Sequence, residues 1–356
     1  MTITTLQDFV LNTLIDPAVS DIHLSVNEYP WVRRGSALYL EKATWPQRIR
    51  DSDLLLLLEA LGKGSHDFTV QCHEHDAAIE LGDERLRLNI FRHSGNLGMI
   101  ARRIPKIIPD IDALGFPEIF KAQLLKVRGL FLITGPMRTG KSTTAAAGLN
   151  FINQQVQGHI LTIEDPIEFP LTAAQCKITR REVGEDTESF ASGGRAALRQ
   201  DANVIFFGEI RDSATMRAAL SAAEAGRLVI GTLHTKSAKE TVSRINSFFQ
   251  ESDQEWARIG LANTLNCIVS QCLIPHTSEV NKQVMCYELL VSNSAIAKSI
   301  AENQITHIGN AMVTGKSHGH VTLNSTLAEK VRLGEITREM AMHYAYDLSG
   351  LMLELS

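Results

Sequence analysis

The stretch Gly135-Pro-Met-Arg-Thr-Gly-Lys-Ser-Thr-Thr144 follows the apolar run Gly129-Leu-Phe-Leu-Ile-Thr134 and precedes an alanine-rich segment. Its two glycines are separated by four residues and are followed by Lys141 and Ser142, which fits the pattern G-x-x-x-x-G-K-[ST]. Glycines let the backbone curl so that successive N–H groups point at one anion, and the positive end of the following helix points to the same place. The stretch therefore predicts a phosphate-binding loop between a buried strand and a helix that runs from Lys141 to about Ile152.

The predicted ligands of this loop are ATP and Mg²⁺. Lys141 is expected to reach the β- and γ-phosphates, while the hydroxyl of Ser142 is expected to ligate the metal ion. The whole set of predicted nucleotide-binding residues is Gly135, Pro136, Met137, Arg138, Thr139, Gly140, Lys141, Ser142 and Thr143.

The composition is typical of a soluble globular protein. The chain has 356 residues, of which 44% are hydrophobic and 21% are charged, and such a length favours two domains. We expect neither a cleavable leader nor a membrane span, because no uncharged apolar run approaches the roughly 18 residues that a span needs. Five scattered cysteines suit a reducing compartment. A cytoplasmic location is therefore predicted.

The charge of the chain argues against a nucleic-acid partner. The net charge is −5 and the isoelectric point is about 6.2, whereas binding to a phosphate backbone needs a basic surface. A local basic patch could still be hidden in this average. No nucleic-acid partner is expected.

Short strand and helix patterns predict a small α+β domain over residues 1–103. A helical stripe of apolar residues ends near Ile15, and Asp51 to Leu61 forms a second expected helix. Two prolines and little periodicity mark residues 104–112 as a linker. The expected strands of this domain are Ser20–Val26, Asp67–Cys72, Ala77–Leu81, Leu86–Arg92 and Gly98–Ile104.

Residues 113–356 are predicted to form a second, α/β domain. A helix from Pro117 to Val127 precedes the strand of the phosphate-binding loop, and further strands are expected at His159–Ile163, Val204–Gly208 and Leu228–Thr232. Strands that alternate with helices predict a parallel sheet with helices on both faces. From Glu251 onward we expect a mostly helical portion.

Three of these strands end in polar side chains that could serve a nucleotide site. Glu164 and Asp165 follow one strand, Glu209 follows the next, and His234 follows the third. The carboxyl ends of parallel strands meet at one edge of a sheet. A single acid at a strand end is usually a solvated loop residue, but three polar ends beside a phosphate loop favour a shared site. Glu209 is the candidate for polarising the attacking water.

Ordered motifs along the chain resemble those of the secretion-superfamily ATPases. They match the Walker A motif, Asp box, Walker B motif and His box of that superfamily, in the order GPMRTGKSTT (135–144), ILTIEDPIEF (160–169), FFGEIRD (206–212) and LVIGTLHT (228–235). Within the superfamily the chain most resembles the twitching-motility retraction ATPases of type IV pili. The resemblance extends to Ser20-Asp-Ile-His-Leu-Ser25 and Thr322-Leu-Asn-Ser-Thr-Leu327. It implies a RecA-like ATPase domain behind an N-terminal PAS-like domain.

The resemblance also implies roles for individual residues. Lys141 and Ser142 would hold phosphate and Mg²⁺, Glu164 would be the Asp-box acid, Glu209 the Walker B acid and His234 the His-box residue. Ser142, Glu164 and Glu209 are accordingly the expected Mg²⁺ ligands, directly or through water.

Three arginines match further positions of the superfamily. Arg195 and Arg199 stand where arginines precede the Walker B motif, and Arg102 stands where one closes the N-terminal domain. Each of them could act on the γ-phosphate of a neighbouring subunit, or could form an ordinary salt bridge between domains.

The implied protein is a hexameric motor, driven by Mg²⁺ and ATP, that docks on a platform protein at the cytoplasmic face of the inner membrane. It would be peripheral to that membrane, with retraction of a type IV pilus as its output. An ATPase of a related secretion or conjugation system is the alternative. Two other classes remain open, a nucleic-acid motor and a nucleotide-binding regulatory subunit that hydrolyses nothing.

The chain departs from the pattern of the superfamily at three places. Met137-Arg138-Thr139 replaces the usual Thr-Gly-Ser of the loop, and Arg227 replaces the first histidine of the His box. Ala295-Ile-Ala-Lys-Ser-Ile300 lacks the arginine of the sequence linked to retraction. The missing arginine weakens the expectation of retraction but leaves the expectation of ATP hydrolysis intact.

Overall fold

Two separate sheets organise the chain in the computed structural model, which describes residues 4–35, 37–61, 74–82, 84–104, 107–279 and 282–356. The chain divides into two units, residues 1–107 and 108–356. The division lies inside the predicted linker of residues 104–112. The predicted strand Asp67–Cys72 lies outside the described residues.

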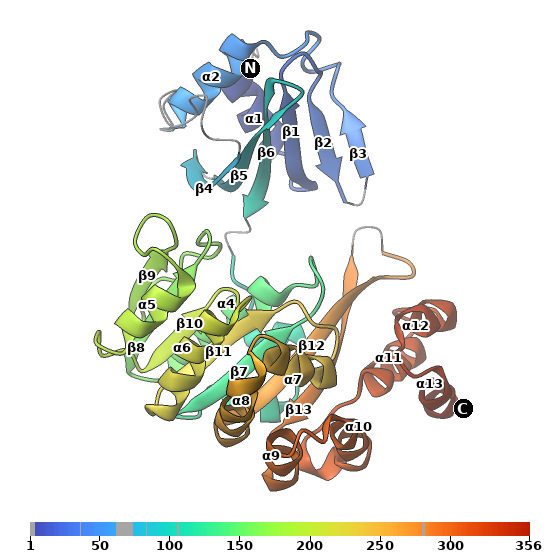
Figure 1. Cartoon of the computed structure of the whole chain (residues 1–356). Coiled ribbons are helices and arrows are strands. Elements are labelled where there is room, and N and C mark those ends of the chain that lie inside the picture. Colours follow the sequence, from blue (N-terminus) through green and yellow to red (C-terminus); the bar gives the residue numbers. More distant parts are fainter. Residues whose placement is uncertain (1–3, 36, 62–73, 83, 105–106, 280–281) are drawn as a thin grey trace. The chain divides into compact units, whose positions relative to one another are not determined.

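The first unit is a six-stranded antiparallel sheet covered on one face by two helices (Figure 1). Its strands lie in the order β3-β2-β1-β6-β5-β4. Apolar side chains of both helices pack with those of the sheet, for example Phe9 against Trp45. The elements are α1 (Leu6–Leu14), β1 (Val19–Ser25), β2 (Trp31–Arg34), β3 (Ala37–Leu40), α2 (Asp51–Ala60), β4 (Glu74–Leu81), β5 (Glu84–His93) and β6 (Asn96–Ile104).

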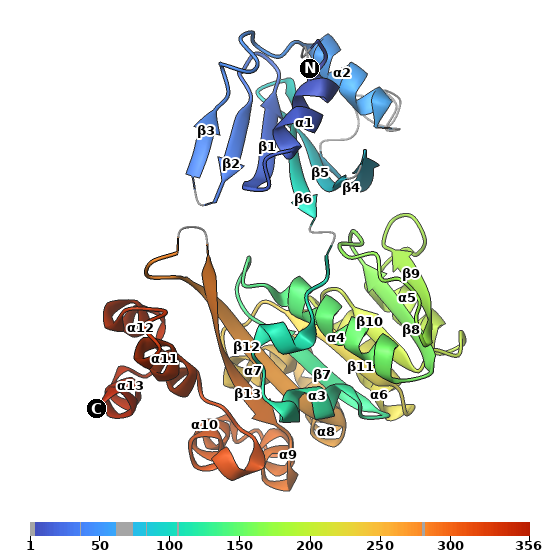
Figure 2. The ribbon, with the colours of Figure 1, turned by 180° about the vertical axis from the view of Figure 1, so that it is seen from behind.

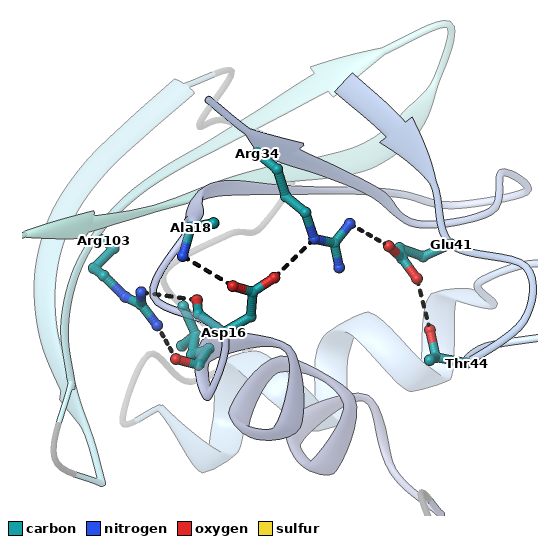
Figure 3. A network of polar contacts seen from close by, with 7 residues as sticks. Asp16, Ala18, Arg34, Glu41, Thr44 and Arg103 are labelled. Carbon is teal, nitrogen blue, oxygen red and sulfur yellow. Dashed lines mark hydrogen bonds and ion pairs between the residues drawn. The ribbon is translucent and has the colours of Figure 1, made fainter. Parts of the chain in front are cut away.

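A network of polar contacts connects the segment after α1 to the sheet of this unit (Figure 3). Arg34, at the end of β2, contacts Asp16 at 3.0 Å and Glu41 at 2.5 Å. Arg103 of β6 donates to the backbone carbonyls of Asp16 and Leu14. The chain that leaves α1 is therefore tied to three strands of the sheet or their ends.

The second unit contains a seven-stranded sheet in the order β13-β12-β7-β11-β10-β8-β9 (Figure 2). Neighbouring strands from β12 to β9 are parallel, and β13 pairs antiparallel with β12. The elements are η1 (Ile111–Leu114), α3 (Glu118–Leu124), β7 (Gly129–Thr134), α4 (Lys141–Gln155), β8 (Gly158–Glu164), β9 (Cys176–Glu182), α5 (Phe190–Ala197), β10 (Val204–Phe207), α6 (Ser213–Glu224), β11 (Leu228–Leu233), α7 (Ala238–Ser247), α8 (Glu251–Thr264), β12 (Leu265–Pro275), β13 (Gln283–Val291), α9 (Ser294–Ala301), α10 (Ile305–Thr314), η2 (Lys316–His318), α11 (Leu323–Arg332), α12 (Arg338–Tyr344) and α13 (Leu348–Leu355).

Helices cover both faces of this sheet, which explains why its central strands are apolar throughout. In β7, Leu130 and Leu132 pack with α6, α7 and α8, whereas Phe131 and Ile133 pack with α3 and α4. All six residues of β7 are buried. Within the described part of the chain, no helix has both the length and the apolar character that crossing a bilayer requires.

The predicted strands around the phosphate loop are present, but the helical portion expected from Glu251 is interrupted. β12 and β13 lie between α8 and α9 and extend the sheet past β7. β12 is buried along nearly its whole length and follows α8 without a turn residue, so its apolar run gave no sign of a change from helix to strand. From Ser294 onward the described secondary structure is helical apart from an isolated bridge at Val321.

Two glycines let α5 approach the sheet closely. A Cβ atom at Gly194 would lie 2.5 Å from the ring of Phe207 in β10 and 3.2 Å from the Cβ atom of Ala218 in α6. A Cβ atom at Gly193 would lie 3.1 Å from the side chain of Ile163. Because Arg195 follows directly, this contact fixes where α5 holds that arginine.

The substitution Gly194→Ala is therefore expected to destabilise the protein. Overpacking of a core contact costs about 1 to 3 kcal/mol, which should lower the midpoint of thermal unfolding measured by calorimetry. Gly309→Ala in α10 is the matched control, because its Cβ atom would meet open space and gains up to about 1 kcal/mol of helix propensity. Equal effects of the two substitutions would contradict the close packing of α5.

Candidate active site

The order of the strands brings the predicted strand-end residues to one edge of the sheet. From the phosphate loop outward, the parallel strands are β7, β11, β10 and β8. His234 follows β11, Glu209 lies two residues after β10, and Glu164 ends β8. All three therefore lie at the edge where β7 enters the loop.

The phosphate loop needs its glycines for space and for backbone conformation. Gly135 has φ of 149° and Gly140 has φ of 83°, in the range that favours glycine. A Cβ atom at Gly135 would collide with the carbonyl oxygen of Gln271 in β12 and would lie 2.6 Å from the hydroxyl of Thr139. The side chain of Gln271 also donates to the carbonyl of Thr139 at 2.6 Å. The loop is thus held against β12.

Four other loop residues are exposed or half-buried. Met137 and Arg138 are exposed, and Arg138 adopts a φ of 63°, which is uncommon for a residue with a side chain. Ser142 and Thr143 are half-buried in the first turn of α4. The bulky residues that depart from the superfamily pattern therefore point away from the packed side of the loop.

Lys141 is the buried cation of the site. Its amine donates to the carbonyl oxygens of Gly135 at 2.9 Å and Pro136 at 2.7 Å, and it lies 3.3 Å from Nδ1 of His234. Burial lowers the pKa of Lys141 to about 8, although the negative charges of Glu209 and Glu168 oppose this shift. A bound phosphate would supply the anion that this amine lacks.

His234 connects Lys141 to Glu209. Its Nε2 atom lies 3.4 Å from a carboxylate oxygen of Glu209, on the side of the ring opposite Lys141. Burial, and then the charge of Lys141, lower the pKa of His234. A neutral ring that accepts from Lys141 at Nδ1 and donates to Glu209 at Nε2 fits both contacts.

Arg211 is a site residue that the sequence analysis did not single out. Its guanidinium contacts Glu209 at 3.0 Å and Asp165 at 3.9 Å. The available signal was its position two residues after Glu209, since side chains two residues apart in an extended segment point to the same side. Arg211 thus joins the acids at the ends of β10 and β8.

Glu164 lies at the neighbouring strand end but outside this line of contacts. It accepts from the backbone N–H of Glu168 at 3.4 Å, and burial raises its pKa to about 7. A carboxyl group whose pKa is near 7 can gain or lose a proton near physiological pH.

The three predicted arginines take no part in these contacts among the described residues. Arg195 and Arg199 are exposed at α5, and Arg199 donates to the carbonyl of Arg195 at 3.3 Å. Neither arginine has an ion pair within the described residues. Arg102 belongs to the first unit, where it pairs with Asp21 at 2.7 Å.

A hollow of about 490 Å³ lies at the opposite end of β7 and does not belong to the nucleotide site. Its lining includes Lys126, Arg128 and Glu224 around Gly129, the first residue of β7. Three helices, α3, α6 and α8, end close to these lining residues in the sequence. Basic residues beside helix C-termini are typical of capping, because those ends carry partial negative charge.

The residues at the loop fit a magnesium ion that arrives with a nucleotide. No group of three or more His, Cys, Asp or Glu side chains able to hold a metal ion occurs among the residues that the structure describes. Mg²⁺ does not require one, because it keeps several waters and binds phosphate oxygens with one or two protein ligands. The half-buried Ser142 and the acids at the strand ends are suitable donors.

A comparison of sequences assigns the chain to a family. The profile described as "Type II/IV secretion system protein" matches residues 99–346, which is most of the chain. The chain belongs to this family. It is 41% identical over 279 residues to the "Twitching motility protein" of Neisseria gonorrhoeae, covering 78% of this chain and 74% of that protein.

Two further comparisons match nearly the whole length of the present chain. It is 36% identical over 327 residues to the "Type IV pilus retractation ATPase PilT" of Pseudomonas aeruginosa, covering 92% of this chain and 94% of that protein. The crystal structure of the pilus retraction motor PilT with bound ADP matches it with a TM-score of 0.88 at 36% identity, covering 98% of this chain and 99% of the other. The predicted family, fold class and ATPase class are thereby confirmed.

The lowered pKa of Lys141 predicts how nucleotide binding depends on pH. Bound phosphate should raise this pKa, so binding takes up a proton and weakens as the pH rises through about 8. The dissociation constant for ADP, measured by fluorescence titration without divalent cations, should increase by up to about tenfold per pH unit above that point.

Lys141→Arg is the control for this pH dependence. Arginine stays protonated throughout the range, so the affinity of this variant should change little between pH 7.5 and 9.5. An equally steep decline in both proteins would assign the effect to another group.

Proposed function

We propose that this chain is a retraction motor of a type IV pilus, in which ATP hydrolysis drives the movement of domains in a homo-hexamer. The observation that carries the proposal is the line of contacts from Lys141 through His234 and Glu209 to Arg211, at 3.3, 3.4 and 3.0 Å. It joins the phosphate loop to the acids at the neighbouring strand ends. The similarity to PilT over both units supports retraction as the output.

Each residue of the site has a proposed task in hydrolysis. Lys141 holds the β- and γ-phosphates, and Ser142 binds the Mg²⁺ ion, which offsets charge on the phosphates. Glu209 orients the attacking water. His234 forms a hydrogen bond with the γ-phosphate and also contacts Glu209. Glu164 would contact the water shell of the metal ion.

The proposed assembly places catalysis at the boundaries between subunits. Residues 1–103 of one chain would close over nucleotide that residues 113–356 of a neighbouring chain, or of the same chain, hold, with residues 104–112 as the linker. Arg102, Arg195 and Arg199 are the candidates for contacting the γ-phosphate of a neighbour. The proposed partner is a platform protein of the inner membrane, with the motor docked on its cytoplasmic side.

The substitution Glu209→Ala should abolish ATP hydrolysis and leave ATP binding nearly unchanged. The carboxylate acts on the water rather than on the nucleotide, so turnover should fall by at least about a hundredfold while the dissociation constant changes little. Phosphate release and nucleotide titration measure the two quantities. Hydrolysis at the wild-type rate would remove Glu209 from its role.

The same variant tests the cellular function. In a bacterium that lacks its own retraction ATPase, the wild-type chain should restore twitching motility, whereas Glu209→Ala should not. Wild-type hydrolysis without restored motility would favour a related secretion or conjugation machine as the partner.

Mixed hexamers can show whether an arginine acts across a subunit boundary. Lys141→Ala and Arg195→Ala proteins should each be inactive, because a missing arginine finger lowers the rate by about 10³ or more. When they are mixed, some boundaries combine an intact phosphate loop with an intact Arg195, so phosphate release should partly return. The same mixture with Arg199→Ala, and then with Arg102→Ala, distinguishes the candidates. Mixtures that stay inactive would place the arginine within its own subunit's site.

A further inference from the structure

Four buried hydroxyl groups form a continuous chain beneath the active site. Ser270 lies 2.7 Å from Thr134, Thr134 lies 3.5 Å from Thr241, and Thr241 lies 2.6 Å from Thr235, measured between hydroxyl oxygens. The exposed fraction of each residue is 5% or less. A run of polar groups this deep in a core is costly unless every member finds a partner.

This chain of hydroxyls joins the two segments whose side chains meet at the site. Thr134 ends β7 directly before Gly135, whose carbonyl binds the amine of Lys141. Thr235 directly follows His234, which contacts that same amine. The hydroxyl chain therefore links the same two segments that the contact between Lys141 and His234 links.

Thr241 is the member that makes the connection. It lies in the first turn of α7, and its hydroxyl donates to the carbonyl of Ser237 at 2.8 Å. A hydroxyl has one proton to donate and two lone pairs that accept. The same proton also faces the hydroxyl oxygen of Thr134 at 3.5 Å, and a lone pair remains to accept a hydrogen bond from Thr235. Valine has the same shape as threonine but could make none of these hydrogen bonds.

We propose that Thr241 is a positioning residue for ATP hydrolysis. Its hydroxyl holds the segment after β11 at the distance from the phosphate loop at which His234 touches both Lys141 and Glu209. The proposal rests on the ATPase role of the site, and it adds a residue that touches neither nucleotide nor metal. A misplacement of about 1 Å in such a site can cost a hundredfold in rate, so a modest loosening is sufficient to be measured.

Two substitutions at one position separate the hydroxyl from the shape of the side chain. Thr241→Val should lower kcat for ATP hydrolysis about tenfold, with less than about a threefold change in KM and in the dissociation constant for ATP. Thr241→Ser keeps the hydroxyl and should retain kcat within about threefold of the wild type. This split between kcat and KM, with rescue by serine, is not expected from a residue that only stabilises α7.

Thr264→Val is the matched control. Thr264 is also a buried helical threonine, and its hydroxyl donates to the carbonyl of Gly260 at 2.7 Å at the end of α8. It belongs to the opposite end of the sheet from the phosphate loop. Its loss should leave kcat unchanged even where it lowers the midpoint of thermal unfolding.

Thr235→Val tests the same link from its other end. It leaves the first turn of α7 intact and should reproduce the loss of kcat, so the proposal remains testable should Thr241→Val not fold. Wild-type kcat in Thr241→Val, or in Thr235→Val where the former does not fold, would overturn the proposal, as would an equal loss in Thr264→Val. The absence of hydrolysis by the wild-type protein would instead overturn the ATPase role itself.

Discussion

The desolvated amine of Lys141 is the feature around which the site is built. A buried cation is stable only when oxygen atoms surround it. The backbone carbonyls of Gly135 and Pro136 provide them, and they can do so only because the loop curls back over its own helix. The same amine contacts His234, which in turn contacts Glu209. One electrostatic requirement therefore arranges residues from three neighbouring strands.

Much of this arrangement could be predicted from the sequence, because local patterns encode it. The strands β7, β8, β10 and β11 are apolar runs that end in polar residues or are followed by them within two residues. Parallel pairing brings such ends to one edge of the sheet. The position of His234 between Lys141 and Glu209 could not be predicted from a local pattern. It depends on the order of strands in the sheet, which no single segment of the sequence contains.

The features that escaped prediction depend on contacts between distant segments. β12 reads as a continuation of an apolar segment, and only pairing with β7 makes it a strand. Gln271 supports the phosphate loop from β12, although its neighbours in sequence carry no signal of nucleotide binding. Arg211 is conspicuous only once Asp165 and Glu209 are known to lie on either side of it. The roles of Arg102, Arg195 and Arg199 depend on a second subunit, so they stay predictions.

The pairing of β12 with β13 also has a mechanical consequence. The hydroxyl of Thr326 in α11 accepts a hydrogen bond from the N–H of Tyr287 in β13 and donates one to the carbonyl of the same residue. The carbonyl of Gln271 in β12 lies directly against Gly135. Hydrogen bonds along the two strands make them a stiff ribbon between these points. A displacement of α11 would therefore act, through these two paired strands, on the backbone of the loop at Gly135.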